Sequence, residues 1–362
     1  MNKNISIVGV GKLGLCLALN LEKKGFNVIG VDVSQDYIDS LNRKDLESDE
    51  ESVSSMLRES KNIQFTTNLE ESLQNDLIFL VVATPSLSDG NYDHRYIDGV
   101  VESYLDLGVP NKHLVICCTT MPGYCSSVAE KMDKLGWTVT YNPEFIAQGT
   151  IIKDQLNPDM VLIGQENEEK AFEVAEVYKA MVENSPRYSF MSRTEAEITK
   201  IALNCFLTTK IAYANMVGDV VLAVGGNPDK VLSAIGSDTR IGSKYLRYGF
   251  GFGGPCFPRD NKAFGNFAEF SGVEPHISRA TDASNRHHLY QQIRNLGQIK
   301  EYTFDCVTYK PESTILTESQ QLALALELVW NGVKVTIKER PSVIEQLKTK
   351  YGEIFTYEPR NN

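Results

Sequence analysis

One cysteine lies in a stretch rich in glycine, and its neighbours could assist reactions of its thiol. The stretch reads Gly249-Phe-Gly-Phe-Gly-Gly-Pro-Cys256-Phe-Pro-Arg259-Asp260. Glycines let a ligand approach the main chain and can leave the thiol accessible, and the charge of Arg259 favours a thiolate. Cys256 is therefore a candidate nucleophile. The alternative is a flexible loop with an inert cysteine, because cysteine more often packs than reacts.

A second motif has the spacing of a dinucleotide site. Gly9-Val10-Gly11-Lys-Leu-Gly14 follows an apolar run, opens a helical pattern, and precedes Asp32 by 23 residues counted from Gly9. The glycines allow a tight turn and close approach of a pyrophosphate, whose charge the helix N-terminus favours. Asp32 can bond a ribose 2′-hydroxyl and would repel a 2′-phosphate, which predicts NAD rather than NADP. The alternative is a turn that no longer binds a cofactor.

Three further segments carry polar groups that could face a ligand. Thr119-Thr120-Met-Pro-Gly and Asn142-Pro-Glu144-Phe-Ile-Ala-Gln148-Gly each follow an apolar strand pattern. The carboxyl ends of such strands bind ligands in open α/β sheets. Lys200 and Asn204 are spaced i, i+4 and share one face of a predicted helix. Lys200 could instead be a surface residue whose stem covers apolar groups.

Composition excludes several classes of protein. The 362 residues contain 36 Lys and Arg against 47 Asp and Glu, a formal net charge of −11, with 42% hydrophobic residues. These proportions exclude disorder, and the acidic balance argues against nucleic acid as a partner. No apolar run approaches the roughly 20 residues of a membrane helix, so we expect a cytoplasmic protein without membrane contact. Seven cysteines without a C-x-x-C pair predict neither a disulfide framework nor a metal site, and most should be buried.

The elements that must position these groups alternate between strands and helices up to residue 192. Short runs of Val, Ile and Leu indicate a parallel sheet covered on both faces, so this Rossmann-like part is predicted to be doubly wound α/β. The predicted strands are 5–10, 28–33, 63–66, 77–83, 114–119, 139–142, 160–163 and 188–191.

The rest of the chain predicts two further parts. Residues 193–296 begin with a helix from Thr194 to about Val224, for which Thr194 and Glu197 fit a capping box. Its apolar residues exceed one amphipathic face, which is typical of a connector or an oligomer interface and predicts a homodimer. Residues 297–362 predict a small α/β domain with strands at 304–309, 333–337 and 354–357 and helices at 318–331 and 342–351.

Taken together, the motifs resemble those of the UDP-glucose/GDP-mannose dehydrogenase family, most closely its UDP-glucose 6-dehydrogenase branch. The resemblance covers residues 1 to about 290 and includes G-V-G-K-L-G-L, T-T-M-P-G, N-P-E-F-I-A-Q-G, E-I-T-K-I-A-L-N-C-F-L, R-I-G-S-K-Y-L-R and G-F-G-G-P-C-F-P-R-D. It implies an N-terminal NAD domain, a central helical dimerisation region with the reactive cysteine, and a reduced C-terminal domain that covers the substrate's nucleotide.

The resemblance also implies a reaction, in which the C6 alcohol of a nucleotide sugar is oxidised to an acid with two NAD and no metal. Cys256 would form a thiohemiacetal and then a thioester with the C6 carbon. Lys200 and Asn204 would stabilise the oxyanion, and Asp260 with Thr120 would order a water. Glu144 would assist hydrolysis of the thioester.

The family's binding residues map onto positions of this chain. Arg240 would reach a neighbouring subunit's substrate. Expected cofactor contacts are Gly9, Val10, Gly11, Gly14, Asp32, Thr84, Thr120 and Arg259. Expected substrate contacts are Glu144, Phe145, Ile146, Ala147, Gln148, Lys200, Asn204, Tyr245, Leu246, Arg247, Tyr248, Gly249 and Gly253.

Four positions depart from the family pattern. Gln148 replaces a frequent Glu, Met160 a common Arg, Thr317 the Arg of the third domain, and Lys12 an aromatic residue. Two other readings stay open: a protein that binds NAD and a nucleotide sugar without turnover, and a two-electron dehydrogenase of the same fold. The second would not need Cys256.

The position of Asp32 predicts a preference between cofactors. NADP should bind more weakly than NAD because its phosphate would meet the carboxylate at close range, a repulsion of about 1–3 kcal/mol or roughly ten- to a hundredfold in affinity. Titration with each cofactor measures the two dissociation constants, and equal values would contradict the role given to Asp32.

Overall fold

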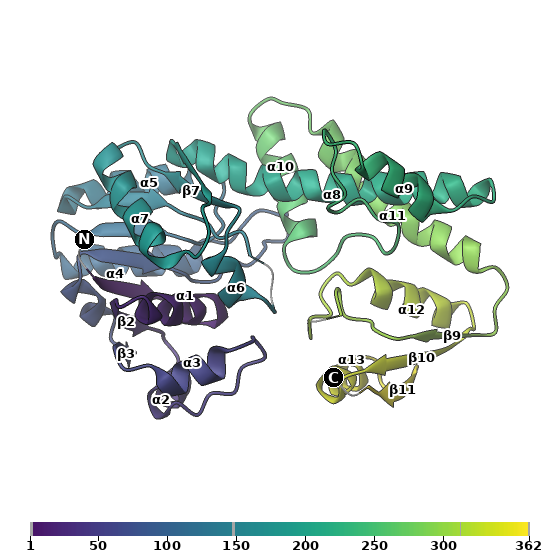
Figure 1. The fold of residues 1–362 in the computed structure, drawn as a ribbon, viewed down its shortest axis with the longest axis horizontal. Coiled ribbons are helices and arrows are strands. Elements are labelled where there is room, and N and C mark those ends of the chain that lie inside the picture. The colour runs from purple at the N-terminus through teal and green to yellow at the C-terminus, as the bar shows by residue number, and fades with distance from the viewer. Residues whose placement is uncertain (1–2, 147–148, 312, 361–362) are drawn as a thin grey trace. The chain divides into compact units, whose positions relative to one another are not determined.

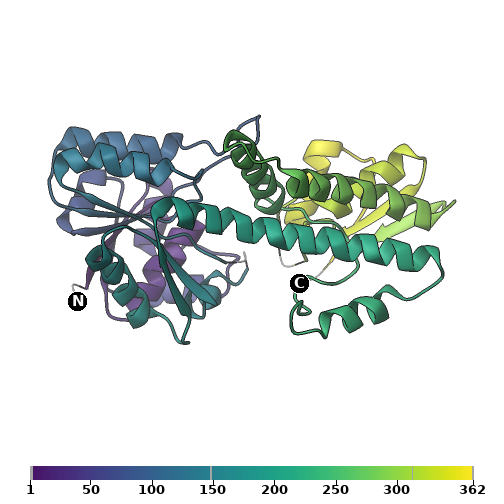
Figure 2. The same ribbon diagram turned by 90° about the horizontal axis from the view of Figure 1, so that it is seen from above.

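A computed structural model describes residues 3–146, 149–311 and 313–360. The chain divides into two compact units, residues 1–200 and 201–362, which are called the first and second unit below. The three predicted parts, 1–192, 193–296 and 297–362, stay a prediction. The long helix α8 (Arg193–Ala223) contains the division after Lys200, and Figure 2 shows it as one continuous teal helix.

The first unit, coloured purple to teal in Figure 1, is built on one eight-stranded sheet in the order β3-β2-β1-β4-β5-β6-β7-β8. Neighbouring strands are parallel except β6 and β7, so the predicted parallel sheet is mixed at that pair. The eight predicted strands are present, and those predicted at 5–10, 28–33, 77–83 and 114–119 end two or three residues earlier than expected. Their bounds are β1 Asn4–Val8, β2 Asn27–Val31, β3 Ile63–Thr66, β4 Leu77–Leu80, β5 His113–Ile116, β6 Thr138–Tyr141, β7 Met160–Gly164 and β8 Arg187–Met191.

Helices cover both faces of this sheet, as predicted. Alternate residues of β4 enter two separate cores: Leu77 and Phe79 pack on one face, and Ile78 and Leu80 on the other. This double burial explains why the strands are continuously apolar rather than alternating. The covering elements are α1 Lys12–Lys23, α2 Gln35–Arg43, α3 Val53–Glu59, η1 Leu69–Gln74, α4 Arg95–Leu107, α5 Tyr124–Met132, η2 Asp133–Leu135, α6 Ile151–Leu156 and α7 Glu168–Met181.

The second unit combines helices with a small parallel sheet. The helices that follow α8 are α9 Pro228–Gly236, α10 Phe257–Phe270 and α11 His276–Leu296. The sheet has the order β11-β10-β9, and α12 and α13 connect its strands. Their bounds are β9 Glu301–Phe304, α12 Gln320–Trp330, β10 Lys334–Glu339, α13 Pro341–Tyr351 and β11 Thr356–Pro359.

The predicted strand at 304–309 is wrong, because β9 ends where the prediction begins. The main-chain N–H groups of Val307 and Thr308 donate to Oε1 of Glu339, at 3.1 and 3.3 Å, instead of continuing a sheet. Glu339 is fully buried at the end of β10, so it needs these donors. The apolar run of the sequence therefore continues past the strand as a loop.

The predicted capping box of the long helix is also wrong. Ser192 and Glu195 form the box two residues earlier: the N–H of Ser192 donates to Oε2 of Glu195 at 2.9 Å, and the N–H of Glu195 donates to Oγ of Ser192 at 3.3 Å. Both pairs fit the sequence pattern, and burial distinguishes them. Glu197 is fully buried and takes other donors.

None of the helices in the described part of the chain is long and apolar enough to cross a membrane.

Candidate functional site

The glycine motif between β1 and α1 has the geometry that a dinucleotide requires. Gly9 has a φ of +91°, and a Cβ there would lie 2.4 Å from the carbonyl oxygen of Val81. A Cβ on Gly14 would lie 2.0 Å from the carbonyl oxygen of Gly9. Gly11 is different, since a Cβ there would meet nothing within 4 Å and the residue is the N-cap of α1. Two glycines thus serve packing, and Gly11 leaves open space beside a helix N-terminus, where a pyrophosphate fits.

Asp32 directly follows β2, so it lies at the carboxyl ends of the strands, as the glycine motif does. Its Oδ1 accepts the N–H of Ser34 at 3.2 Å, which holds the carboxylate beside the start of α2. The nearby Tyr37 hydroxyl donates to the carbonyl oxygen of Val10 at 3.0 Å. Burial and the charge of Asp32 raise the pKa of Tyr37 to about 12, so Tyr37 stays a neutral donor that fixes the glycine loop. Thr84, a further expected cofactor contact, is buried in the segment that follows β4.

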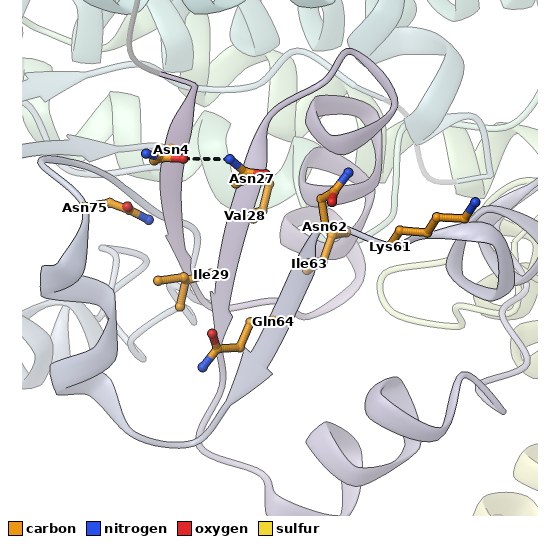
Figure 3. Close-up of a pocket in the computed structure, with 9 residues that line it drawn as sticks. All are labelled: Asn4, Asn27, Val28, Ile29, Lys61, Asn62, Ile63, Gln64 and Asn75. Carbon is orange, nitrogen blue, oxygen red and sulfur yellow. Dashed lines mark hydrogen bonds between the residues drawn. The ribbon is translucent and has the colours of Figure 1, made fainter.

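A hollow of about 330 Å³ lies at the amino ends of β1 and β2 (Figure 3). It includes Asn4 and Asn27, the first residues of β1 and β2, whose side chains bond to each other at 2.8 Å. The glycine motif follows the other ends of these strands, so this hollow is not the cofactor site. Its remaining lining residues are Val28, Ile29, Lys61, Asn62, Ile63, Gln64 and Asn75.

Thr120 is held by a buried carboxylate that the sequence did not assign to the site. Its hydroxyl donates to Oε1 of Glu197 at 2.8 Å, and the N–H groups of Gly123 and Cys125 donate to the same carboxylate at 2.6 and 2.8 Å. Glu197 therefore satisfies the N-terminus of α5 and attaches the second turn of α8 to the Thr120 segment. The sequence signal that could have identified Glu197 was its position one turn before Lys200 on the same helix face.

Lys200 and Glu144 lie together in the first unit. Lys200 is 9% exposed, which contradicts the surface alternative, and its Nζ donates to the carbonyl oxygen of Glu144 at 2.5 Å. The ammonium also lies 4.5 Å from the ring centre of Phe145. Burial raises the pKa of the Glu144 carboxyl to about 7, although the Tyr178 hydroxyl, 3.2 Å away, and the charge of Lys200 oppose this rise. Glu144 can therefore exchange a proton near neutral pH.

The second unit holds the cysteine and a buried ionic group. Cys256 is exposed and is the N-cap of α10, whose N-terminus favours negative charge. Asp260, only 1% exposed, accepts Nδ2 of Asn204 at 2.6 Å and Nε of Arg259 at 3.0 Å. Asn204 and Arg259 therefore fix the Asp260 carboxylate one turn from the thiol. The expectation that most cysteines are buried is confirmed, because Cys16, Cys117, Cys118, Cys125 and Cys205 are buried and Cys306 is partly buried.

The expected substrate-binding segment before the cysteine is partly occupied by contacts within the protein. Leu246 is buried with Ala214 and Leu232, whereas Tyr245 and Arg247 are exposed. Tyr248 and Gly249 form hydrogen bonds with side chains of the helices α8 and α11. The remaining expected residues have these positions: Gly253 lies against the main chain of Glu318, Arg240 pairs with Asp238 at 2.6 Å, and Ile146 packs on the core of the first unit.

Several expectations stay predictions. Ala147 and Gln148 lie outside the described residues. Thr120 and Asp260 belong to different units, so their shared water stays a prediction, as does contact of Arg259 with the cofactor. Of the departures, Lys12 pairs with Asp49 at 2.9 Å, and Met160 is partly buried and packs against the core of the first unit. Within residues 3–146, 149–311 and 313–360, no group of three or more His, Cys, Asp or Glu could hold a metal ion.

Comparison with known proteins matches this arrangement to one family. Residues 3–182 match the NAD binding domain, and residues 194–287 the central domain, of the UDP-glucose/GDP-mannose dehydrogenase family. The UDP-glucose 6-dehydrogenase of Rickettsia conorii is 32% identical over 345 residues, 92% of this chain and 79% of that protein. That of Rickettsia felis is 31% identical over 289 residues, 78% of this chain but 64% of its own length.

The fold of one solved structure matches that of nearly the whole chain. The UDP-glucose dehydrogenase of Pyrobaculum islandicum superimposes with a TM-score of 0.88 at 29% identity, covering 98% of this chain and 85% of that one. With the family matches, this likeness confirms the predicted fold class. The chain belongs to the UDP-glucose/GDP-mannose dehydrogenase family, and residues 3–182 form its NAD-binding domain.

Proposed function

We propose that this protein oxidises the C6 alcohol of a nucleotide sugar to the acid, with UDP-glucose as substrate and NAD as oxidant. The observation that carries the proposal is the exposed Cys256 at the N-terminus of α10, one turn from the buried Asp260 that Asn204 and Arg259 hold. A two-electron alcohol oxidation has no use for such a thiol, whereas a four-electron oxidation needs a nucleophile for the aldehyde. UDP-glucose is proposed because the two Rickettsia relatives and the Pyrobaculum islandicum structure are named for that substrate.

Different residues of the chain carry out the steps of the proposed oxidation. Bound NAD would accept a hydride from the sugar's C6 carbon at each of two oxidations. Between them the Cys256 thiolate adds to the aldehyde carbon and forms a C–S bond, and loss of the second hydride leaves a thioester. Lys200 and Asn204 stabilise the oxygen anion that forms at C6. Glu144 takes a proton from the water that cleaves the thioester, which releases the acid and the thiol.

The first alternative, a binding protein without turnover, would require no reactive thiol. Retention of Cys256, Lys200, Asp260 and Glu144 together supports the enzyme, since loss of turnover would remove the constraint on each of them. The second alternative, a two-electron dehydrogenase, gives one NADH per sugar. The family description names both UDP-glucose and GDP-mannose, so a panel of UDP- and GDP-sugars distinguishes the substrates.

Substitution of the cysteine separates these alternatives. The wild type should form two NADH per sugar consumed, counted by absorbance. Cys256→Ser and Cys256→Ala should form at most one, because a hydroxyl without a dedicated base is a poor nucleophile and a methyl is none. Two NADH per sugar in Cys256→Ala would refute the thioester route. No NADH from the wild type with any sugar of the panel would support the binding protein.

The carboxyl of Glu144 predicts a pH dependence for thioester hydrolysis. Because the pKa of Glu144 is raised to about 7, the carboxylate form increases from pH 6 to 8, and single-turnover hydrolysis should accelerate up to about tenfold and then level off. Glu144→Gln should be slow and flat across this range. Tyr178→Phe is the matched control: the lost hydrogen bond raises the pKa further and should move the rise to higher pH. An unchanged profile in Glu144→Gln would contradict the assignment.

We further propose that the protein is a homodimer whose subunits pair through α8. Phe206, Tyr213, Met216 and Val220 are 49–67% exposed and share one face of this helix by their spacing. A second copy presents the same face and can cover it in a symmetric interface.

Charges in this face should dissociate the dimer. Phe206→Glu with Val220→Glu should sediment as a monomer at micromolar concentration, because two carboxylates per subunit would be buried without partners. Trp330→Glu is the control, since Trp330 is equally exposed but lies on α12. A wild type that sediments as a monomer at this concentration would contradict the proposal.

A further inference from the structure

The segment that precedes Cys256 is held between two helices of the second unit by residues to which the proposed reaction gives no role. We call this group the loop clamp; it consists of Asn215, Gly218 and Asp219 on α8 and Asn285, His288 and Gln292 on α11. The spacings i, i+3, i+4 and i, i+3, i+7 place each set on one helix face. The clamp acts on residues 248–252, which include the expected substrate contacts Tyr248 and Gly249.

The clamp fixes main-chain groups at both ends of this segment. The N–H of Gly249 donates to Oδ1 of Asn215 at 3.0 Å, and its carbonyl oxygen accepts from Gln292 Nε2 at 3.3 Å. At Phe252 the N–H and the carbonyl oxygen both bond to the Asn285 amide at 2.9 Å. The backbone of the loop is therefore determined by side chains of α8 and α11 rather than by its own glycine-rich sequence.

His288 links the two sides of the clamp. Its Nδ1 lies 2.7 Å from Oδ2 of Asp219, and its Nε2 lies 2.7 Å from the carbonyl oxygen of Gly249. A carboxylate and a carbonyl are both acceptors, so each ring nitrogen must donate. The ring, 3% exposed, is therefore an imidazolium paired with a carboxylate.

The groups around the ring support this charge state. Tyr248 packs its ring edge-on against His288, with centres 5.5 Å apart, and its hydroxyl donates to Oδ1 of Asp219 at 3.0 Å. Burial and the charge of Asp219 raise the pKa of Tyr248 to about 12, so the hydroxyl keeps its proton. Asp219 from α8 and Tyr248 from the loop are thus titratable groups that face His288. A Cβ on Gly218 would lie 2.0 Å from the Tyr248 ring, so this packing needs the glycine.

We propose that His288, as an imidazolium held by Asp219, is the positioning residue that sets the 248–252 loop for the nucleotide-sugar substrate. The inference rests on the proposed function, because the loop's role as a substrate segment comes from it. His288 acts through Gly249 and does not contact the substrate.

The charge state can be tested without turnover. In ¹⁵N-histidine-labelled full-length protein at pH 7, two-bond ¹H–¹⁵N spectra should show one of the five histidines with both ring nitrogens protonated, and His288→Gln should remove that signal. A neutral His288 ring at pH 7 would overturn the proposal, whatever the activity of the protein.

A matched pair of variants tests the positioning. The amide nitrogen of Gln reaches the position of Nε2 and can donate to Gly249, whereas that of Asn reaches only the position of Nδ1. His288→Gln should therefore keep KM for the sugar within about threefold of wild type, and His288→Asn should raise it about tenfold or more, the value of one charge-assisted hydrogen bond. KM for NAD should not change in either variant.

Equal KM values for the Gln and Asn variants would overturn the proposal. If the wild type forms no NADH, the proposed function fails, and calorimetric titration of the same variants with UDP-glucose replaces KM by a dissociation constant.

Discussion

Polar side chains buried on the long helix α8 impose the constraint on which the rest of the site depends. Glu197, Lys200, Asn204 and Asn215 are each at most 9% exposed on a helix whose sequence is mostly apolar. A buried polar group without a partner is costly, so each needs a partner from another segment. Within the first unit the helix thereby holds the Thr120 and Glu144 segments, and within the second unit it holds the start of α10 and the 248–252 loop.

The segment between β9 and α12 supports the cysteine loop through its main chain. The N–H of Gly254 donates to the carbonyl oxygen of Thr317 at 3.1 Å, and Gly253 lies against the main chain of Glu318. Any residue at position 317 can supply that carbonyl. The replacement of the family's Arg by Thr317 therefore leaves this support of the loop intact, and its effect is confined to what the Arg side chain would have contacted.

The sequence by itself determined the order of strands and helices and the positions of the glycine motif, Asp32 and Cys256. These features depend on residues close together in the chain: continuous apolar runs, glycines at fixed spacing, and an acid after the next strand. The sequence also placed Lys200 and Asn204 one turn apart, since helical spacing is local.

The tertiary structure alone decided which of these groups are paired. Two overlapping patterns fitted a capping box, and burial assigned Ser192 to the box and Glu197 to Thr120, which lies 77 residues away in the chain. Asp219 and His288 are 69 residues apart, and neither belongs to a recognisable motif. Such pairs arise where separate elements bury polar atoms against each other, and no local pattern encodes the partner. The side chains that position the site were therefore found only in the folded chain.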